Sequence, residues 1–170
     1  YPHSNNDCKI ENMKRTLITL AASMLMTITL SAQDFPLWLR RNDISPDGSK
    51  IVFTYKGNIY TVPVTGGKAV QLTTNPEYDS DPMWTPDGKS IIFSSYREKS
   101  KDIYKVSAEG GNPVRLTSHT QNETPLEVMR DGSVLYTANI QQDAQYGDFP
   151  GNVQLYMVGP DGGKPIQVTS

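Results

Sequence analysis

The sequence predicts an all-β fold made of short antiparallel strands in repeated units. Three observations support this. A block of turn, strand and glycine signals recurs three times after residue 33, with fixed spacings inside it. The runs between turn signals are four to seven residues long and rich in β-branched and aromatic side chains, as strands are. No stretch after residue 33 has a convincing 3.6-residue apolar period, which an amphipathic helix would show.

The first 32 residues are predicted to lie outside this fold. Residues 1–12 precede the first methionine, Met13, and we interpret them as a leader or an expression scar. Residues 13–32 combine two cations, an uncharged run and the small residues Ser31 and Ala32, which is the pattern of a helical signal peptide. The run is shorter than the roughly 20 apolar residues of a spanning helix, and a buried core helix is the alternative. We expect cleavage after Ala32 and export to the periplasm or the medium.

The composition excludes several classes of protein. With 16 Lys and Arg against 18 Asp and Glu, the net charge is −2, which argues against a nucleic-acid-binding domain, since these carry a basic face. The single cysteine, Cys8, falls in the leader, so residues 33–170 have neither a disulfide framework nor a thiolate zinc site. Packing must therefore stabilise this part of the chain.

Each repeat opens on an Asp-Gly turn followed by an apolar strand. In Ser-Pro-Asp-Gly, proline presets the second position of a type I turn and glycine accepts the last. The turns are Ser45–Gly48, Thr85–Gly88 and Met129–Gly132, and the strands that follow contain Ile51–Phe53, Ile91–Phe93 and Val134–Tyr136. The third copy lacks the proline and reaches its aromatic residue one position earlier, so its first hairpin is the least well specified.

The second half of each repeat has constant spacing. Gly-Gly starts seven residues after the Ile or Leu of an Ile-Tyr or Leu-Tyr pair, and Leu-Thr or Val-Thr starts six residues after the first glycine. The pairs are at 59–60, 103–104 and 155–156, the glycines at 66–67, 110–111 and 162–163, and the closing pairs at 72–73, 116–117 and 168–169. The link from the Asp-Gly turn to this half varies, with steps of 11, 15 and 23 residues. Insertions confined to one loop indicate a repeated unit with one free face.

Each unit is predicted to form four short strands, with Gly-Gly turning the chain between the third and the fourth. Apolar runs such as residues 51–53 indicate strands covered on both faces, as happens when sheets stack. We therefore predict a β-propeller with blades near residues 40–82, 83–126 and 127–170. An open sandwich is the alternative. Because propellers close with roughly four to eight blades, three blades make an incomplete propeller.

The repeat pattern over residues 43–170 resembles the WD-like propeller repeat of TolB and of the tricorn-protease propellers. With the segment at 33–40 and the insertion at 140–152, the chain resembles the start of an exported tricorn-like serine peptidase of a Gram-negative bacterium. The resemblance implies a propeller that scaffolds, recognises or admits peptide, with a PDZ module and a serine peptidase domain beyond Ser170. Its implied partners are a peptide or protein substrate and those further domains, without nucleic acid or a stable membrane span.

Two alternatives stay open. One is a periplasmic TolB-like propeller that binds proteins without catalysis, and the other is the propeller of a prolyl-oligopeptidase-type peptidase. The repeat is specific for the fold but not for the activity, because enzymes and binding proteins share it.

We predict no catalytic residue, no cofactor site and no metal site in this chain. One histidine, His119, follows residue 32, and it falls in a connection between two repeats. Ser118 beside it does not make a dyad, because catalytic sets are recognised by geometry, and the sequence contains no Gly-x-Ser-x-Gly elbow. We interpret His119 as an exposed or locally hydrogen-bonded loop residue.

Three segments imitate ligand-binding motifs. Residues 43–48 match the first half of a calcium loop, but Thr54 stands where the twelfth position needs Glu. The carboxylates of residues 77–81 are interpreted as a solvated connection between blades. Residues 159–164 have the wrong spacing for a phosphate-binding loop.

The lengthened loops are the best candidates for binding. Arg97–Asp102 and Ile140–Asn152 extend the same connection in successive repeats, and loops on one rim of a rigid scaffold commonly carry function. Tyr146 and Phe149 in the longer loop are candidates for contacting a peptide or another domain. The alternative is that they cover the edge of the blade.

Overall fold

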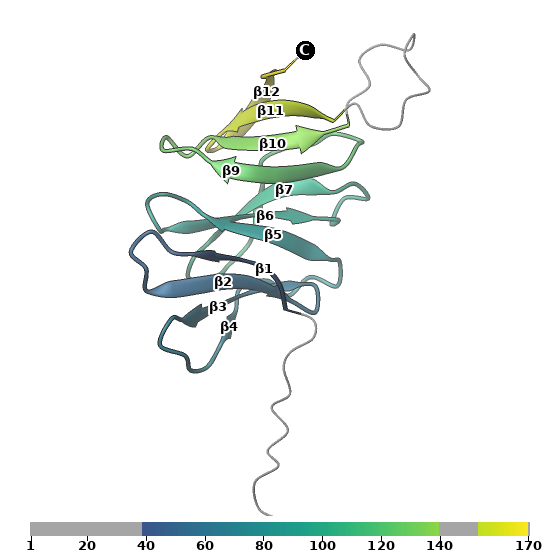
Figure 1. Ribbon diagram of the computed structural model, residues 1–170. Coiled ribbons are helices and arrows are strands. Elements are labelled where there is room, and N and C mark those ends of the chain that lie inside the picture. The colour runs from purple at the N-terminus through teal and green to yellow at the C-terminus, as the bar shows by residue number, and fades with distance from the viewer. Residues whose placement is uncertain (1–38, 140–152, 170) are drawn as a thin grey trace, which may run out of the picture. The chain divides into compact units, whose positions relative to one another are not determined.

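The computed structural model describes residues 39–139 and 153–169, which form strands and their connections (Figure 1). The strands are β1 (Leu39–Ile44), β2 (Lys50–Tyr55), β3 (Asn58–Pro63), β4 (Val70–Gln71), β5 (Asp79–Trp84), β6 (Ser90–Ser95), β7 (Asp102–Ser107), β8 (Val114–Arg115), β9 (Glu123–Val128), β10 (Val134–Ala138), β11 (Gln154–Gly159) and β12 (Gly162–Gln167). By its internal contacts the chain divides into two units, Tyr1–Pro36 and Leu37–Ser170, and every described residue belongs to the second. The predicted signal peptide lies outside the described residues. Among the residues described, none forms a helix able to cross a membrane.

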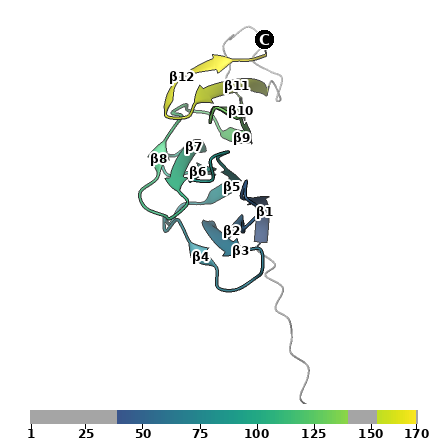
Figure 2. The ribbon, with the colours of Figure 1, turned by 90° about the vertical axis from the view of Figure 1, so that its left-hand side faces the viewer.

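The strands form three four-stranded antiparallel sheets in chain order. The first sheet contains β1–β4, the second β5–β8 and the third β9–β12. Figure 2 shows the first strands β1, β5 and β9 along one edge of the stack and the fourth strands β4, β8 and β12 along the other. The predicted all-β fold of four-stranded blades in an incomplete propeller is confirmed.

The predicted Asp-Gly turns join the first and second strands of all three sheets. The amide of the glycine donates a hydrogen bond to the carbonyl of the residue three positions earlier: Gly48 to Ser45 and Gly88 to Thr85 at 2.8 Å, and Gly132 to Met129 at 2.9 Å. Each glycine has a positive φ, between 66° and 85°, which other residues rarely adopt. The third hairpin forms without proline because glycine and the aspartate remain. The Asp131 carboxylate accepts a hydrogen bond from the Ser133 amide at 3.0 Å.

The closing Leu-Thr or Val-Thr pair clamps the end of each repeat onto its third strand. The threonine hydroxyl oxygen accepts a hydrogen bond from a third-strand amide, in the pairs Ile59–Thr73 (3.0 Å), Ile103–Thr117 (2.9 Å) and Leu155–Thr169 (3.0 Å). The amide of the residue before each threonine donates to the carbonyl of the same partner residue. This double contact explains why the spacing is constant in all three repeats.

The first strands of the second and third sheets begin before the predicted blade starts at 83 and 127. Strand β5 begins at Asp79 and β9 at Glu123. The β5 sequence contains two aspartates and Pro82, which are rare in strands. Proline is tolerated here because β5 is an edge strand of its sheet, and the pairing with β6 shifts between Ser80 and Met83.

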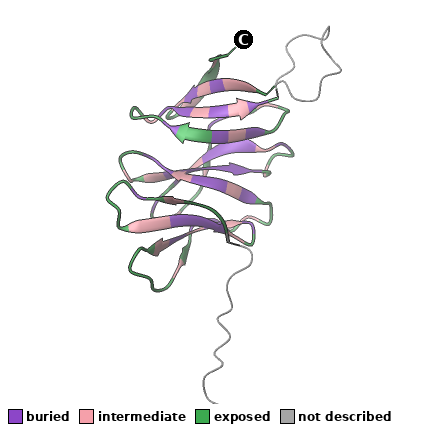
Figure 3. Cartoon of the chain, viewed as in Figure 1, coloured by how far each residue is buried: buried purple, intermediate pink, exposed green. Residues whose placement is uncertain are grey.

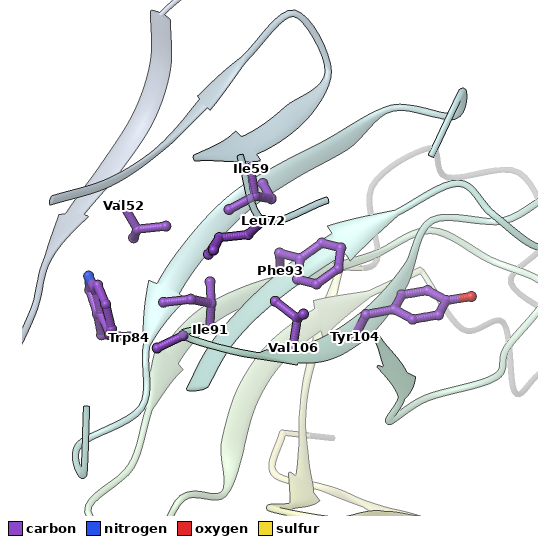
Figure 4. Close-up of a cluster of buried hydrophobic side chains, with 9 residues drawn as sticks. Val52, Ile59, Leu72, Trp84, Ile91, Phe93, Tyr104 and Val106 are labelled. Carbon is purple, nitrogen blue, oxygen red and sulfur yellow. The ribbon is translucent and has the colours of Figure 1, made fainter. Parts of the chain in front are cut away.

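Two apolar clusters fill the spaces between the sheets. Figure 4 shows the first cluster, in which Val52, Ile59 and Leu72 of the first sheet face the second sheet. The second cluster joins the second and third sheets, with Ile92, Ile103 and Leu116 on one side. Residues 91–95 of β6 are all buried (Figure 3), so this strand is covered on both faces. In the run at 51–53, for which such cover was predicted, Val52 and Phe53 are buried but Ile51 is only partly buried.

Candidate functional site

The connections between second and third strands, and those between sheets, lie at one end of the sheets. We call the described parts of these connections, residues 56–57, 72–78, 96–101 and 116–122, the loop rim. Here each sheet is joined to the next: the Asp79 amide donates to the Gly57 carbonyl at 2.9 Å, and the Glu123 amide donates to the Lys101 carbonyl at 2.7 Å. The predicted binding loop at 140–152, with Tyr146 and Phe149, lies outside the described residues.

Three buried carboxylates, Asp79, Asp102 and Glu123, stand beside this rim. A buried carboxylate requires a partner, because loss of hydration costs several kcal/mol. The Arg97 guanidinium lies 2.9 Å from Asp79 Oδ2, and the Arg115 guanidinium lies 2.8 Å from Asp102 Oδ2. Burial raises the pKa of Asp102 in spite of Arg115 and of the hydroxyl of Ser100.

Glu123 is paired with a hydroxyl instead of a cation. Its carboxylate accepts a hydrogen bond from the Thr117 hydroxyl, the same group that clamps β7. The pKa of Glu123 is raised to about 7, mainly by burial and also by the charge of Asp102, although the Thr117 hydrogen bond and the charge of Arg115 act to lower it. Glu123 therefore titrates near neutral pH at the junction of the second and third sheets.

Arg97, the first residue of the predicted binding loop, is fixed at the base of that loop. Its guanidinium lies over the rings of Phe93 and Tyr104, at 5.5 and 5.4 Å from their centroids. Its Nε donates to the Ser95 hydroxyl at 3.0 Å. The loop therefore starts from a rigid base, because Arg97 is fixed by the carboxylate of Asp79, the hydroxyl of Ser95 and two aromatic rings.

A second polar cluster lies where the first strands of the three sheets meet. The Asp81 carboxylate lies 3.2 Å from Arg41 Nε and 2.8 Å from Lys101 Nζ, and Lys101 also donates to the Thr124 hydroxyl at 3.1 Å. Burial acts to raise the pKa of Asp81, but the hydrogen bond and charge of Lys101, with smaller effects of Ser80 and Arg41, lower it. Arg41 and Asp81 have positive φ angles of 45° and 54°, so local backbone distortion turns these side chains to the cluster.

A shallow groove follows the same edge, and we call it the first-strand groove. Arg41, Asp43, Asp81, Trp84 and Glu127 are among its lining residues. Arg41, Asp43 and Glu127 offer one cation and two carboxylates to it, whereas Asp81 and Trp84 are buried. The Trp84 amide donates to Asp43 Oδ2 at 2.8 Å, and its buried Nε1 has no hydrogen-bond partner among the described residues. A groove of this character can take a polar or charged chain such as a peptide.

His119 lies in the connection between β8 and β9. Its Nδ1 accepts a hydrogen bond from the Gln121 amide at 3.2 Å, and its carbonyl accepts one from the Ser100 hydroxyl at 2.8 Å. This geometry agrees with the interpretation of His119 as a locally hydrogen-bonded loop residue. That the chain carries no catalytic residue, cofactor or metal stays a prediction.

In the segments that imitate metal-binding loops, the carboxylates make hydrogen bonds and ion pairs that hold turns and strands together. Asp47 accepts hydrogen bonds from the Ser45 hydroxyl (2.6 Å) and the Ser49 amide (3.0 Å), and these contacts lower its pKa to about 2. The interpretation of residues 77–81 as a solvated connection is wrong for two members. Asp79 and Asp81 are buried in β5, because each is paired with a cation that the sequence places far away. Within residues 39–139 and 153–169, no three His, Cys, Asp or Glu side chains are grouped to hold a metal.

Sequence reasoning missed the buried pairs Asp79–Arg97 and Asp102–Arg115. One signal was available for the second pair. Asp102 opens the third strand at the repeat position that Asn58 and Gln154 occupy, so a polar residue recurs there before an apolar pair. Its partner Arg115 also has a repeat position, shared with Gln71 and Gln167, and Gln167 contacts Gln154 as Arg115 contacts Asp102. Arg97 carries no repeat signal and could not be assigned.

Three comparisons with known proteins extend these observations. A model of the tricorn protease N-terminal beta propeller domain matches residues 36–170. An uncharacterized protein of Agrobacterium fabrum is 32% identical over 134 residues, which cover 74% of this chain and 42% of that protein. The Tol-Pal system protein TolB of Bordetella pertussis is 42% identical over 55 residues, which cover 32% of this chain and 13% of that protein.

A solved structure agrees with the same fold. The putative TolB from Agrobacterium tumefaciens has a TM-score of 0.64 at 24% identity, over 76% of this chain and 48% of that one, and at this identity the likeness shows the fold alone. The chain spans less than half the length of each of these three relatives. The resemblance predicted from the repeat is confirmed by a family match that covers all described residues. The chain belongs to the family of the tricorn protease N-terminal β-propeller domain.

Proposed function

We propose that this chain is the propeller part of an exported serine peptidase of the tricorn type, in which it recognises peptide substrates and controls their access. The family match over residues 36–170 carries this proposal. The catalytic domain would be supplied by sequence outside these 170 residues. The pattern of residues 13–32 supports export, since a basic start, an apolar run and small residues make a signal peptide.

The first-strand groove supports a role in peptide recognition. An extended peptide offers amides, carbonyls and side-chain charges, and the groove offers the cation of Arg41 and the carboxylates of Asp43 and Glu127 in one strip. Arg41 is the accessible cation, because its side chain is 72% exposed although its Nε lies beside Asp81. The Arg41 guanidinium can therefore turn to a ligand carboxylate, because its own charge is already in contact with water and Asp81 keeps Lys101 as a partner.

The loop rim supports a scaffold role. Its carboxylates are fixed by Arg97, Arg115 and Thr117, so the loops rise from a base with little freedom. Binding loops on a rigid scaffold lose less conformational entropy when they capture a ligand. The rim and the groove would then guide a peptide while another domain cuts it.

The test uses the protein encoded by the complete reading frame. We expect a fluorophosphonate probe to label one serine outside this chain, and we expect hydrolysis of long peptides. Arg41→Asp should raise KM for long peptides about tenfold, the effect of losing one charge-assisted contact, and should leave a small activated ester unaffected. Arg40→Asp is the matched control, since Arg40 is an exposed neighbour outside the groove. Equal KM values in both variants would refute the access role.

A second candidate is a protein-binding propeller without catalysis. The 42% identity to TolB of Bordetella pertussis over 55 residues favours it. Absence of fluorophosphonate labelling, together with stable capture of a protein partner by the complete product, would support this function over the first.

A further inference from the structure

The loop rim contains two junctions built on the same backbone contacts. At each junction, the amide of a third-strand isoleucine donates to a threonine hydroxyl, and the amide of the buried acid that opens the next sheet donates to a rim carbonyl. The first junction pairs Ile59 with Thr73 (3.0 Å) and Asp79 with Gly57 (2.9 Å), and the second pairs Ile103 with Thr117 (2.9 Å) and Glu123 with Lys101 (2.7 Å). Because these contacts are the same, the two junctions can be compared by the surroundings of their acids.

The two acids have different partners. Asp79 lies 2.9 Å from the guanidinium of Arg97, which neutralises its buried charge. Among residues 39–139 and 153–169, no cation forms an ion pair with Glu123, and the Thr117 hydroxyl is its hydrogen-bond donor. In the sequence, the third repeat has Ile140 at the position of Arg97. An ionised Glu123 would therefore be a buried charge without a counter-ion, which is strongly destabilising.

The groups around Glu123 add to this cost. The charge of Asp102 acts against ionisation of Glu123, and the guanidinium of Arg115 is already engaged with Asp102 at 2.8 Å. Within the described part of the chain, the buried Oδ1 of Asp102 and the buried hydroxyl of Tyr136 have no hydrogen-bond partner. The charged and titratable groups on the elements packed around this junction are Asp102 on β7, Arg115 on β8, Tyr136 on β10, and Lys101 and His119 in the connections. A proton on Glu123 removes one of two neighbouring negative charges, in agreement with a pKa of about 7.

The second junction also ties two rim segments to each other. The Ser100 hydroxyl donates to the His119 carbonyl at 2.8 Å, and the Lys101 amide donates to the side-chain oxygen of Asn122 at 3.1 Å. With the Glu123 amide on the Lys101 carbonyl, these contacts bind residues 96–101 to residues 116–122. Separation of the two segments is therefore the shortest route by which water can reach the Glu123 carboxylate.

We propose that Glu123 is a proton-operated latch on the loop rim. With its proton, Glu123 keeps residues 96–101 bound to residues 116–122, and in its ionised form it releases them. The ionised form favours the released rim because a carboxylate gains hydration when the segments separate. The first junction has no such dependence, because Arg97 supplies the positive charge there.

The direction of the pH dependence follows from the raised pKa of Glu123. The closed junction binds the proton more tightly than the released one, so the latch is fully effective below the ordinary pKa of 4.5. Its effect is lost as the pH rises through 7. From pH 5 to pH 8, we expect the fraction of molecules with a released second junction to increase at least about tenfold.

The test is amide hydrogen exchange of the protein encoded by the complete reading frame, at pH 5 and pH 8, with each rate divided by that of an unstructured peptide at the same pH. Protection of the Ile103 and Glu123 amides should fall at least about tenfold between the two pH values. The Ile59 and Asp79 amides are the matched control in the same molecule, and their protection should change less than about threefold.

Glu123→Gln keeps the shape of the side chain and cannot ionise, so at pH 8 it should retain the protection that the wild-type chain has at pH 5. Glu77→Gln, at an exposed position of the first junction, should keep the wild-type pH dependence.

Three outcomes would overturn the proposal. Constant protection at the second junction would show that Glu123 does not control the rim. An equal fall at both junctions would show that exchange occurs by unfolding of the whole propeller. A fall that persists in the Glu123→Gln variant would assign the effect to another group. The wild-type comparison needs no variant and no peptide, so its result is separate from that of the proposed peptidase function.

Discussion

The second and third sheets have the same repeat but different surroundings. Among the described residues, the second sheet packs against another sheet on both faces and the third sheet on one. Leu116 and Val168 occupy the same repeat position, yet the first is buried and the second is half exposed. The difference shows that the strands and turns of a blade follow from the sequence of that blade, whereas the burial of its side chains depends on the neighbouring blade on each side. Stability in such arrays is a sum of intrinsic and nearest-neighbour contributions.

The largest expected effect is loss of an aromatic ring between covered sheets. Phe93→Ala should lower the free energy of unfolding by about 3–5 kcal/mol, because it leaves a cavity in a packed contact. Leu135→Ala, on the open face of the third sheet, should cost less than about 1.5 kcal/mol, since little packing is lost. Urea denaturation followed by fluorescence measures both values. Equal losses would contradict the difference between the two sheets.

The next effect concerns buried and exposed ion pairs. Arg97→Met leaves the carboxylate of Asp79 buried without its cation, which should cost about 3 kcal/mol. The pair of Lys105 with Asp161 links the second and third sheets, but its carboxylate is largely exposed, so Asp161→Ala should give no measurable change. The same denaturation experiment compares them. A clear loss of stability in the Asp161 variant would show that this exposed ion pair contributes more to the free energy of unfolding than an ion pair in contact with water should.

Stability should also depend on pH at the junction of these two sheets. The pKa of Glu123 is raised in the folded chain to about 7, so the folded state binds a proton more tightly than the unfolded state. This contribution is fully present below the unfolded pKa near 4.5 and is lost as the pH rises through 7. We expect the free energy of unfolding to fall by about 2–3 kcal/mol between pH 5 and pH 8.

Glu123→Gln is the control for this pH dependence. It keeps the shape of the side chain and removes its titration, so stability should vary much less over the same pH range. The groups that face Glu123 are Thr117, Asp102, Arg115 and Tyr136. A pH dependence that persists in the Gln variant would assign the effect to Asp102, whose pKa burial also raises.

The smallest expected difference is between the threonine clamps. Thr117→Val removes a buried acceptor of the Ile103 amide and also the hydroxyl that donates to the Glu123 carboxylate, so it should cost about 2 kcal/mol. Thr169→Val removes the equivalent contact of the Leu155 amide at an exposed site, where water replaces it, and should cost well under 1 kcal/mol. Thermal unfolding midpoints provide the comparison. Equal shifts would mean that the third sheet is as well covered as the second.

The sequence was sufficient for the Asp-Gly turns and the apolar strands, because each depends on neighbours within a few residues. The predicted Gly-Gly turn between the third and fourth strands is present in the first two sheets, but in the third sheet Gly162 and Gly163 begin β12 and the turn lies before them. Strand β5 was the exception within the fold. Its aspartates and proline suggest a loop, and they form a strand because Arg97 and Lys101, some 20 residues later, pair with the carboxylates.

The candidate site was less accessible to sequence reasoning than the fold. The loop beginning at Arg97 was identified from its length, but its rigid base was not, since the contacts of Arg97 with Asp79 and the two rings join different strands. The positive φ angles of Arg41 and Asp81 carry no local sequence signal either. Contacts between side chains of different strands, such as those of Arg97, leave no signal in the spacing of residues along the sequence.

Hydrogen exchange of the central strands tests the role of neighbours most directly. Strands β6 and β10 have equivalent positions in their sheets and are paired on both sides, so they differ mainly in how many faces are covered. The amides of β6 should exchange much more slowly than those of β10. Equal protection of the two strands would contradict the account, because it would mean that a blade is as stable with one neighbour as with two.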